Sequence, residues 1–142
     1  MKKFFAVIVV IAVVYIGWGQ LYRTDNPAVL SGHSTNLARA FDERVSDVQV
    51  EGSGGVIKIL KDDNDGSRHQ RFILRLDSGQ TVLIAHNIDL APRLPSLRKG
   101  DTVAFFGEYE WNAKGGVIHW THHDPGGRHV GGWLKLNGKT YQ

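Results

Sequence analysis

The sequence predicts a mainly β domain, a small antiparallel barrel of five strands, with a short helix before it and a transmembrane helix at the N-terminus. Three observations carry this prediction. Residues 4–22 contain no charged side chain, whereas from residue 48 onward apolar side chains recur at every second position, which is the period of a strand. The 17 glycines, several of them in pairs such as Gly54-Gly55 and Gly115-Gly116, are typical of turns between short strands.

Residues 1–22 are predicted to anchor the chain in a membrane. The pair Lys2-Lys3 precedes a run of 19 uncharged residues, which at about 1.5 Å per residue approaches the ~30 Å of a hydrocarbon core. The lysines favour a cytoplasmic N-terminus, and Trp18 and Tyr22 suit the far interface. We therefore expect an inner-membrane protein with a periplasmic domain. The alternative is a signal peptide cleaved near the Gly-Trp-Gly sequence at 17–19, which would release the domain into the periplasm.

Residues 23–47 are predicted to form a linker followed by a short amphipathic helix. The turn-forming sequence Asp25-Asn26-Pro27 marks the linker. Ser34 can cap a helix in which Leu37, Phe41 and Val45 recur at spacing four. Acidic side chains near the C-terminal end of this segment oppose the helix dipole, so the helix should be short.

Residues 48–142 are predicted to form the β domain. The first strand, residues 48–60, contains Gly-Ser-Gly-Gly and should bend there. The second and third strands flank a Ser-Gly turn, the fourth and fifth flank a glycine-containing turn, and an Asn-Gly turn marks a further hairpin near the C-terminus. The predicted ranges of the second to fifth strands are 69–77, 80–86, 102–111 and 117–121. Two prolines make the connection between the third and fourth strands irregular or at most briefly helical.

This order of elements matches an OB-like barrel, although an open antiparallel sheet or another small barrel fits the same pattern. Four stretches also resemble a family of small exported bacterial proteins of unknown function. They are DDNDGSRHQRFIL, AHNIDLAPRLP, GEYEWNAKGGVIHWTHHDP and GGWLKLNGKTYQ. The resemblance covers roughly residues 48–142. It implies the same domain boundary and implies no activity or catalytic residue.

Composition excludes several classes of function. Setting aside Lys2 and Lys3 leaves 15 basic side chains against 14 acidic ones, so a strong electrostatic footprint for a phosphate backbone is absent, although local patches stay open. Nucleic acid is therefore a possible partner but not the favoured one. The chain has no cysteine, which excludes disulfides, thiolate nucleophiles and cysteine metal sites. It also lacks a phosphate-binding loop, a nucleophile elbow and a dinucleotide fingerprint.

One candidate ligand-binding group lies on the predicted hairpin. A two-residue turn at Ser78-Gly79 would place Phe72 opposite Ala85 on an apolar face and Arg71 opposite His86 on the other face, with His69 in line. His69, Arg71 and His86 would then meet at the open end of the hairpin and could bind an anion or polarise a carbonyl group. The alternative is an ordinary solvated strand end.

A second candidate is a histidine-rich segment. Four of the seven histidines fall between residues 119 and 129. If the chain turns near Pro125, then His122, His123, Asp124 and His129 could converge on a divalent metal, because neutral imidazole is a common zinc or copper ligand. The alternative is a polar turn whose histidines bind backbone groups.

These observations predict a non-enzymatic, membrane-anchored extracytoplasmic binding module for a ligand or an envelope partner. The alternative is a metal-dependent hydrolase or nuclease that uses the histidine-rich segment. A purely structural role in an envelope complex also stays open. The binding module is favoured because the sequence offers no clear catalytic set and the histidine spacing matches no known metal motif.

Overall fold

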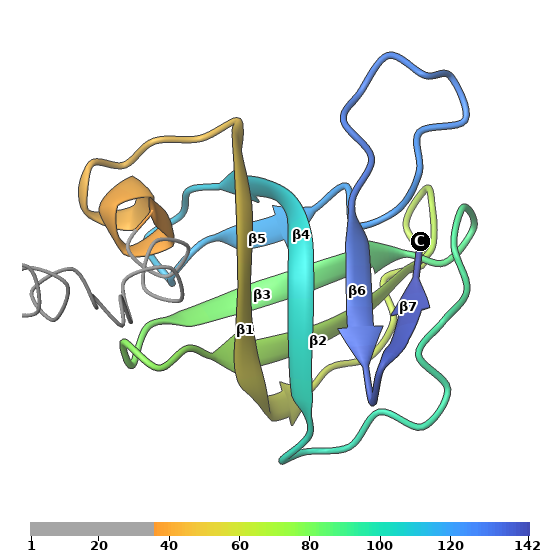
Figure 1. Ribbon diagram of the computed structural model, residues 1–142, viewed down its shortest axis with the longest axis horizontal. Coiled ribbons are helices and arrows are strands. Elements are labelled where there is room, and N and C mark those ends of the chain that lie inside the picture. Colours follow the sequence, from red (N-terminus) through yellow and green to blue (C-terminus); the bar gives the residue numbers. More distant parts are fainter. Residues whose placement is uncertain (1–35) are drawn as a thin grey trace, which may run out of the picture.

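The computed structural model describes residues 36–142, which form a closed five-stranded β-barrel extended by a C-terminal hairpin (Figure 1). The barrel order is β1-β2-β3-β5-β4, and pairing of β1 with β4 closes it. The β3–β5 pair is parallel, whereas the other neighbouring pairs are antiparallel. The strands are β1 Val48–Ile59, β2 His69–Arg75, β3 Thr81–Asn87, β4 Thr102–Glu110, β5 Val117–His119, β6 Trp133–Leu136 and β7 Lys139–Tyr141.

The bend in β1 lets one strand serve two neighbours. Its first part pairs with β4 and its last part with β2, and Gly55 pairs with residues of both. A Cβ atom on Gly54 would lie 2.7 Å from the backbone oxygen of Arg75, which explains why this position holds glycine. The bend predicted from the Gly-Ser-Gly-Gly sequence is therefore confirmed.

The core fills the barrel with side chains at alternating strand positions. In β2, β3 and β4 every second residue is buried, as a barrel with one inward face requires. Phe72, Phe105 and Tyr109 are fully buried and provide most of the aromatic volume.

A short helix at residues 36–42 covers one end of the barrel (Figure 1). Leu37 and Ala40 are buried in the core, and Phe41 packs against it. The indole N–H of Trp111 donates to the Phe41 carbonyl at 3.0 Å and so ties the helix to the barrel. Val45 is 37 % exposed, so the predicted apolar stripe ends one turn earlier than expected.

The predicted anchor at 1–22, the linker up to residue 35 and the Ser34 cap lie outside the described residues. Within residues 36–142 no helix is long and apolar enough to cross a membrane.

The β2–β3 hairpin has a different register from the one predicted. Leu76 and Gln80 close a three-residue turn, in which Gly79 adopts a φ of 86°. As a result Phe72 pairs with Ile84 instead of Ala85, and Gln70 pairs with His86. This shift of one residue turns His86 from the outer face into the barrel.

Strands β5 and β6 act as one interrupted strand along the same edge of β4. The β4 residues Glu108–Glu110 pair with β5, and Val103–Phe106 pair with β6. Residues 120–132 leave the sheet between these two pairings and form the loop that stands away from the barrel in Figure 1. The Gly132 N–H donates to the His122 carbonyl at 2.9 Å and closes the base of this loop.

Candidate ligand-binding groove

The hairpin end and the histidine-rich segment line a common groove of about 210 Å³. The groove lies where β3 and β5 separate, because β5 ends at His119 whereas β3 continues to Asn87. Its floor and one wall come from the outer face of β2 and β3, and its other wall comes from the start of the 120–132 loop. The lining residues are Ser67, His69, Ala85, Asn87, Leu90, His119, Trp120 and His122.

Two groove histidines are oriented by backbone carbonyls. The Nδ1 of His69 lies 2.8 Å from the Ser67 carbonyl oxygen, and the Nδ1 of His122 lies 2.7 Å from that of His123. A carbonyl oxygen only accepts, so each Nδ1 carries the proton. In the neutral ring, each Nε2 then presents a lone pair for a ligand.

His86 lies beneath the groove and holds its walls together. It is completely buried between the Thr121 hydroxyl, 2.8 Å from Nδ1, and the Pro92 carbonyl, 3.0 Å from Nε2. Burial lowers its pKa to about 4, although the Pro92 contact opposes this shift. His86 is therefore neutral at physiological pH and links β3 to both the β3–β4 connection and the segment after β5.

Trp120 stands at the edge of the groove in a strained backbone conformation. Its φ is 53°, a region that side chains other than glycine seldom adopt. The ring stacks on His129 at 3.9 Å between centroids and 9° between planes, and it also contacts His122 at 5.3 Å. Such strain costs about 1–3 kcal/mol and persists where surrounding contacts enforce it, which is common at binding sites.

Glu108 connects two histidines behind this tryptophan. One carboxylate oxygen lies 2.7 Å from His129 Nε2, and the other lies 3.3 Å from His119 Nε2. The His119 nitrogen is buried and makes no hydrogen bond, so the second contact is close in distance but unfavourable in direction. Burial lowers the pKa of His129, but the Val130 carbonyl and the carboxylates of Glu108 and Asp124 outweigh it and raise the pKa overall.

Asp124 orders the loop that carries these rings. Its carboxylate accepts backbone N–H groups from Gly126, Arg128 and His129 at 2.7–2.9 Å. These bonds lower the pKa of the carboxyl group. The loop therefore positions His129 through its backbone, and the Asp124 oxygens are occupied in doing so.

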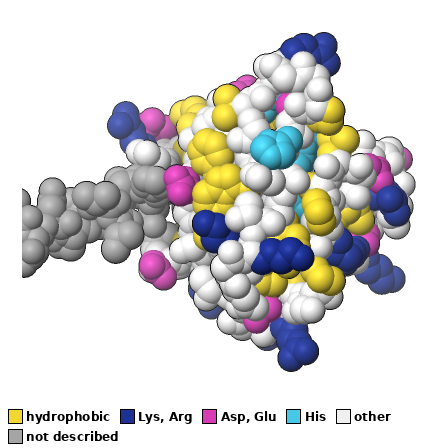
Figure 2. Space-filling model, turned by 45° about the vertical axis from the view of Figure 1, so that its right-hand side comes forward, with side chains coloured by type: hydrophobic (Ala, Val, Ile, Leu, Met, Phe, Trp, Pro, Cys, Tyr) yellow, Lys and Arg dark blue, Asp and Glu magenta, His cyan; other side chains and the backbone are white. Residues whose placement is uncertain are grey.

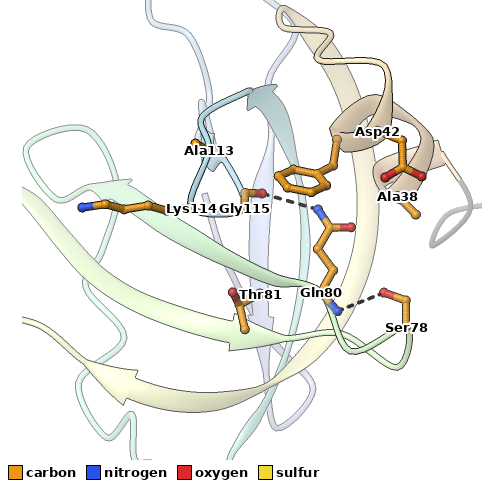
Figure 3. Close-up of a pocket in the computed structure, with 9 residues that line it drawn as sticks. Ala38, Asp42, Ser78, Gln80, Thr81, Ala113, Lys114 and Gly115 are labelled. Atoms are coloured by element: carbon orange, nitrogen blue, oxygen red, sulfur yellow. Dashed lines mark hydrogen bonds between the residues drawn. The ribbon is translucent and has the colours of Figure 1, made fainter.

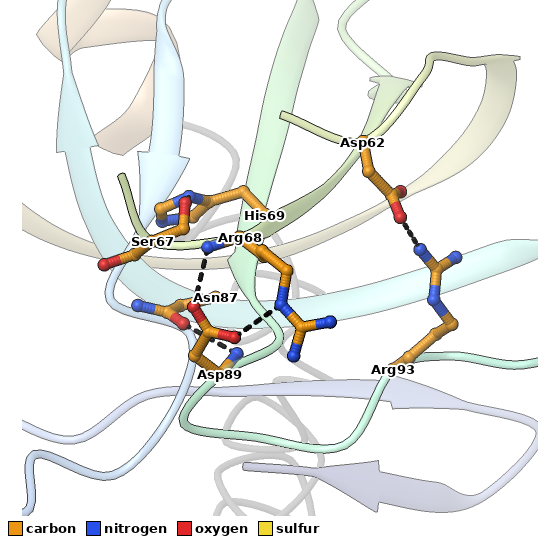
Figure 4. Close-up of polar contacts among 7 residues, drawn as sticks. All are labelled: Asp62, Ser67, Arg68, His69, Asn87, Asp89 and Arg93. Atoms are coloured by element: carbon orange, nitrogen blue, oxygen red, sulfur yellow. Dashed lines mark hydrogen bonds and ion pairs between the residues drawn. The ribbon is translucent and has the colours of Figure 1, made fainter. Parts of the chain in front are cut away.

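The basic residues near the groove are largely neutralised (Figure 4). Arg68 forms an ion pair with Asp89 at 2.7 Å, and Arg93 forms one with Asp62. On the face shown in Figure 2, Lys and Arg side chains are interspersed with hydrophobic, acidic and uncharged surface, and histidine reaches the surface beside hydrophobic atoms. Because Arg68 and Arg93 are paired with carboxylates, the side chains beside the groove do not form the continuous positive surface of a phosphate-backbone site.

The predicted group of His69, Arg71 and His86 is not brought together on one face. His69 and Arg71 lie on the outer face of β2, whereas His86 points into the barrel. The Arg71 Nε donates to the Lys61 carbonyl at 3.2 Å. The three-residue turn, which shifts the register, is the reason for the difference.

The predicted metal ligands His122, His123, Asp124 and His129 are likewise not assembled into one ligand set. His129 is held by Glu108, and the Asp124 carboxylate by backbone N–H groups. Within residues 36–142 no group of three His, Asp or Glu side chains is arranged to hold a metal ion. The turn near Pro125 does form, with the Gly127 N–H donating to the Asp124 carbonyl at 3.0 Å, while His122 and His129 both contact the Trp120 ring.

A larger cavity of about 420 Å³ lies at the opposite end of the hairpin, between the short helix and the β4–β5 turn (Figure 3). Its polar groups serve local contacts, such as the bonds from Gln80 to the Gly115 carbonyl and to Ser78. Among residues 36–142, Phe41 is the one aromatic residue in its lining, and none of the histidines in that range lines it. We therefore take the histidine groove as the better candidate site.

Sequence reasoning missed the contributions of Asn87, Glu108 and Trp120. Glu108 and Glu110 share the outer face of β4 next to His119, a pattern that the alternation of β4 could have revealed. Nothing in the sequence indicates the positive φ of Trp120 or the separation of β3 from β5.

Fold and groove together define a small closed β-barrel protein with a surface site of histidine, asparagine and tryptophan at the β3–β5 divide. The chain belongs to the family described as "Protein of unknown function (DUF3465)", which matches residues 22–142. No curated protein matches the chain.

Proposed function

We propose that this protein is a membrane-anchored, extracytoplasmic binding module of the OB type and that the histidine groove is its ligand site. The observation that carries the proposal is that the hairpin end and the histidine-rich segment line one groove. Two groove histidines, His69 and His122, are oriented in advance by hydrogen bonds to the backbone carbonyls of Ser67 and His123, as a binding site requires.

The strand arrangement supports the OB assignment. OB barrels are five-stranded Greek-key barrels that bind ligands on the β2–β3 face beside their connecting loops. Here the barrel closes through β1 and β4, and the groove uses β2, β3 and Ser67 from the β1–β2 loop. The second wall of the groove is the segment after β5, so the shape of this site depends on that segment as well as on the β2–β3 face.

The location of the groove suits an anchored protein. The uncharged run at 4–22 behind Lys2-Lys3 supports an anchor with the domain outside the cytoplasm. The described residues begin at the short helix, which lies beside the β2–β3 turn. The groove lies at the other end of the β2–β3 hairpin. The ligand site is thus remote from the entry point of the chain.

The orientation can be tested with a single introduced thiol, because the chain has no cysteine. Leu90 is 46 % exposed at the groove, so a Leu90→Cys variant offers an accessible label. We expect a membrane-impermeant maleimide to label this variant in cells whose outer membrane has been permeabilised. Labelling only after the inner membrane is disrupted would contradict a periplasmic domain.

The binding site can be tested by photo-crosslinking in living cells. A photoactivatable amino acid replaces Leu90, and Val45, which is 37 % exposed near the short helix, provides a control of similar exposure. We expect an adduct from position 90 and none from position 45. Equal crosslinking at both positions, or none at position 90, would show that the groove is not the ligand site.

A further inference from the structure

We infer that the groove binds a hydroxyl-rich ligand, a saccharide chain that brings at most one negative charge into the site. This inference rests on the proposed function, because it assumes that the groove is the ligand site. It follows from the hydrogen-bonding groups, the apolar surface and the charge that the groove presents.

The groove offers hydrogen-bond acceptors that are fixed in position. His69 and His122 each use Nδ1–H on a backbone carbonyl, which directs the other ring nitrogen to a partner that donates. His122 is only 4 % exposed, and it lines the groove. A ligand hydroxyl can donate to such a nitrogen, whereas a carboxylate or phosphate oxygen cannot.

Asn87 adds donors beside these acceptors. Its side-chain oxygen accepts the Asp89 backbone N–H at 2.9 Å, so the amide NH₂ faces away from that contact and is available to a ligand oxygen (Figure 4). Sugar hydroxyls both donate and accept, and they therefore match a site that mixes bare imidazole nitrogens with an amide NH₂. Ala85, Leu90 and Trp120 provide apolar surface for the C–H faces of a sugar ring.

The charge near the groove argues against a polyanion. Arg68 and Arg93 are paired with Asp89 and Asp62. Arg71 lies across the ladder from Ala85 and contacts a carbonyl, so in the described part of the chain its charge is not balanced by a carboxylate. One such guanidinium fits one acidic group, whereas a nucleic acid depends on several phosphate contacts.

The inference can be tested on the full chain in detergent with ¹⁵N-labelled histidine. NMR spectra of the imidazole nitrogens are recorded during titration with neutral glucose, mannose, galactose and N-acetylglucosamine oligosaccharides, and separately with oligo-dT and Zn²⁺. We expect saturable shifts of the His69 and His122 Nε2 signals with at least one oligosaccharide. Failure of all four oligosaccharides, or binding of only oligo-dT or Zn²⁺, would overturn the inference.

Matched variants separate ligand contact from folding. Asn87→Asp keeps the oxygen that accepts the Asp89 N–H but removes the donors, and we expect binding at least tenfold weaker. His122→Phe should weaken binding to a similar extent. The control Asn112→Asp, which likewise keeps an oxygen that accepts backbone N–H groups but lies outside the groove lining, should leave binding unchanged. An unchanged signal for buried His86 confirms that each variant is folded. Unchanged affinity in folded Asn87→Asp would contradict the inference.

The crosslinking experiment distinguishes the two proposals. A position-90 adduct that loses mass on periodate treatment supports the saccharide. A periodate-resistant adduct from position 90, with none from position 45, would support the groove as the ligand site but refute the inference that its ligand is a saccharide.

Discussion

Acidification should destabilise the barrel through His86, and a His86→Gln variant should lose this effect. Burial lowers the His86 pKa from 6.5 to about 4. Between these values the unfolded chain binds a proton that the folded chain excludes, so stability rises with pH across this window and falls on acidification. Since one pKa unit corresponds to about 1.36 kcal/mol, moving from pH 7.5 to 4.5 should cost ~2.5 kcal/mol from this residue alone.

Urea unfolding of the full chain in detergent, followed by tryptophan fluorescence at pH 7.5, 5.5 and 4.5, measures this effect. Glutamine has no titrating ring, so the difference in unfolding free energy between wild type and His86→Gln should shrink by about 2.5 kcal/mol as the pH falls. Asp89 and Asp124 also have lowered pKa values, but they contribute equally to both proteins and cancel in the difference. A difference that does not change with pH, or an NMR titration of His86 centred near 6.5, would refute the reasoning.

Three further changes test the loop that carries the site. Gly132→Ala should destabilise the protein by more than about 2 kcal/mol, because the new Cβ would lie 2.1 Å from a backbone oxygen. The control Gly131→Ala, whose Cβ would have its nearest neighbour at 3.4 Å, should change stability little. Equal urea midpoints for the two variants would contradict this prediction. Glu108→Gln should lower the pKa of His129, because it removes a carboxylate that favours the protonated ring. An NMR titration of His129 measures this change. An unchanged pKa would show that the contact between Glu108 and His129 is unimportant. Asp124→Ala should lower the free energy of unfolding by about 1 kcal/mol and speed amide hydrogen exchange in the 120–132 loop. Asp124→Asn keeps an acceptor oxygen and should lower it by less. Unchanged exchange in both variants would show that the carboxylate does not order the loop.

The ends of the five barrel strands could be predicted from sequence to within two residues, whereas the hairpin register could not. Alternating burial fixes where β2 and β3 lie, but residues 82–85 of β3 are apolar on both faces. The pattern therefore fits two registers equally well, and the choice depends on whether the turn has two or three residues. Gly79 at positive φ selects the three-residue turn and so reverses the side on which His86 lies.

The candidate site was only partly predictable for a related reason. The histidines at 69 and 122 could be identified as unusual, but their approach depends on where β5 ends and β3 continues, which is a property of the closed barrel. The predicted metal ligands do not converge in the described residues, and Asp124 instead binds three backbone N–H groups of its own turn. Local hydrogen bonding of this kind is common for Asp before Gly-rich turns and competes with any ligand role.

The most direct test of the central claim is an amide NMR map of the full chain with the bound oligosaccharide. If the groove is the ligand site, the largest shifts will fall on Asn87, Leu90 and Trp120, while Ala38 and Ala113 at the larger cavity will stay unchanged. Shifts concentrated at Ala38 and Ala113, with the groove signals unmoved, would contradict the claim.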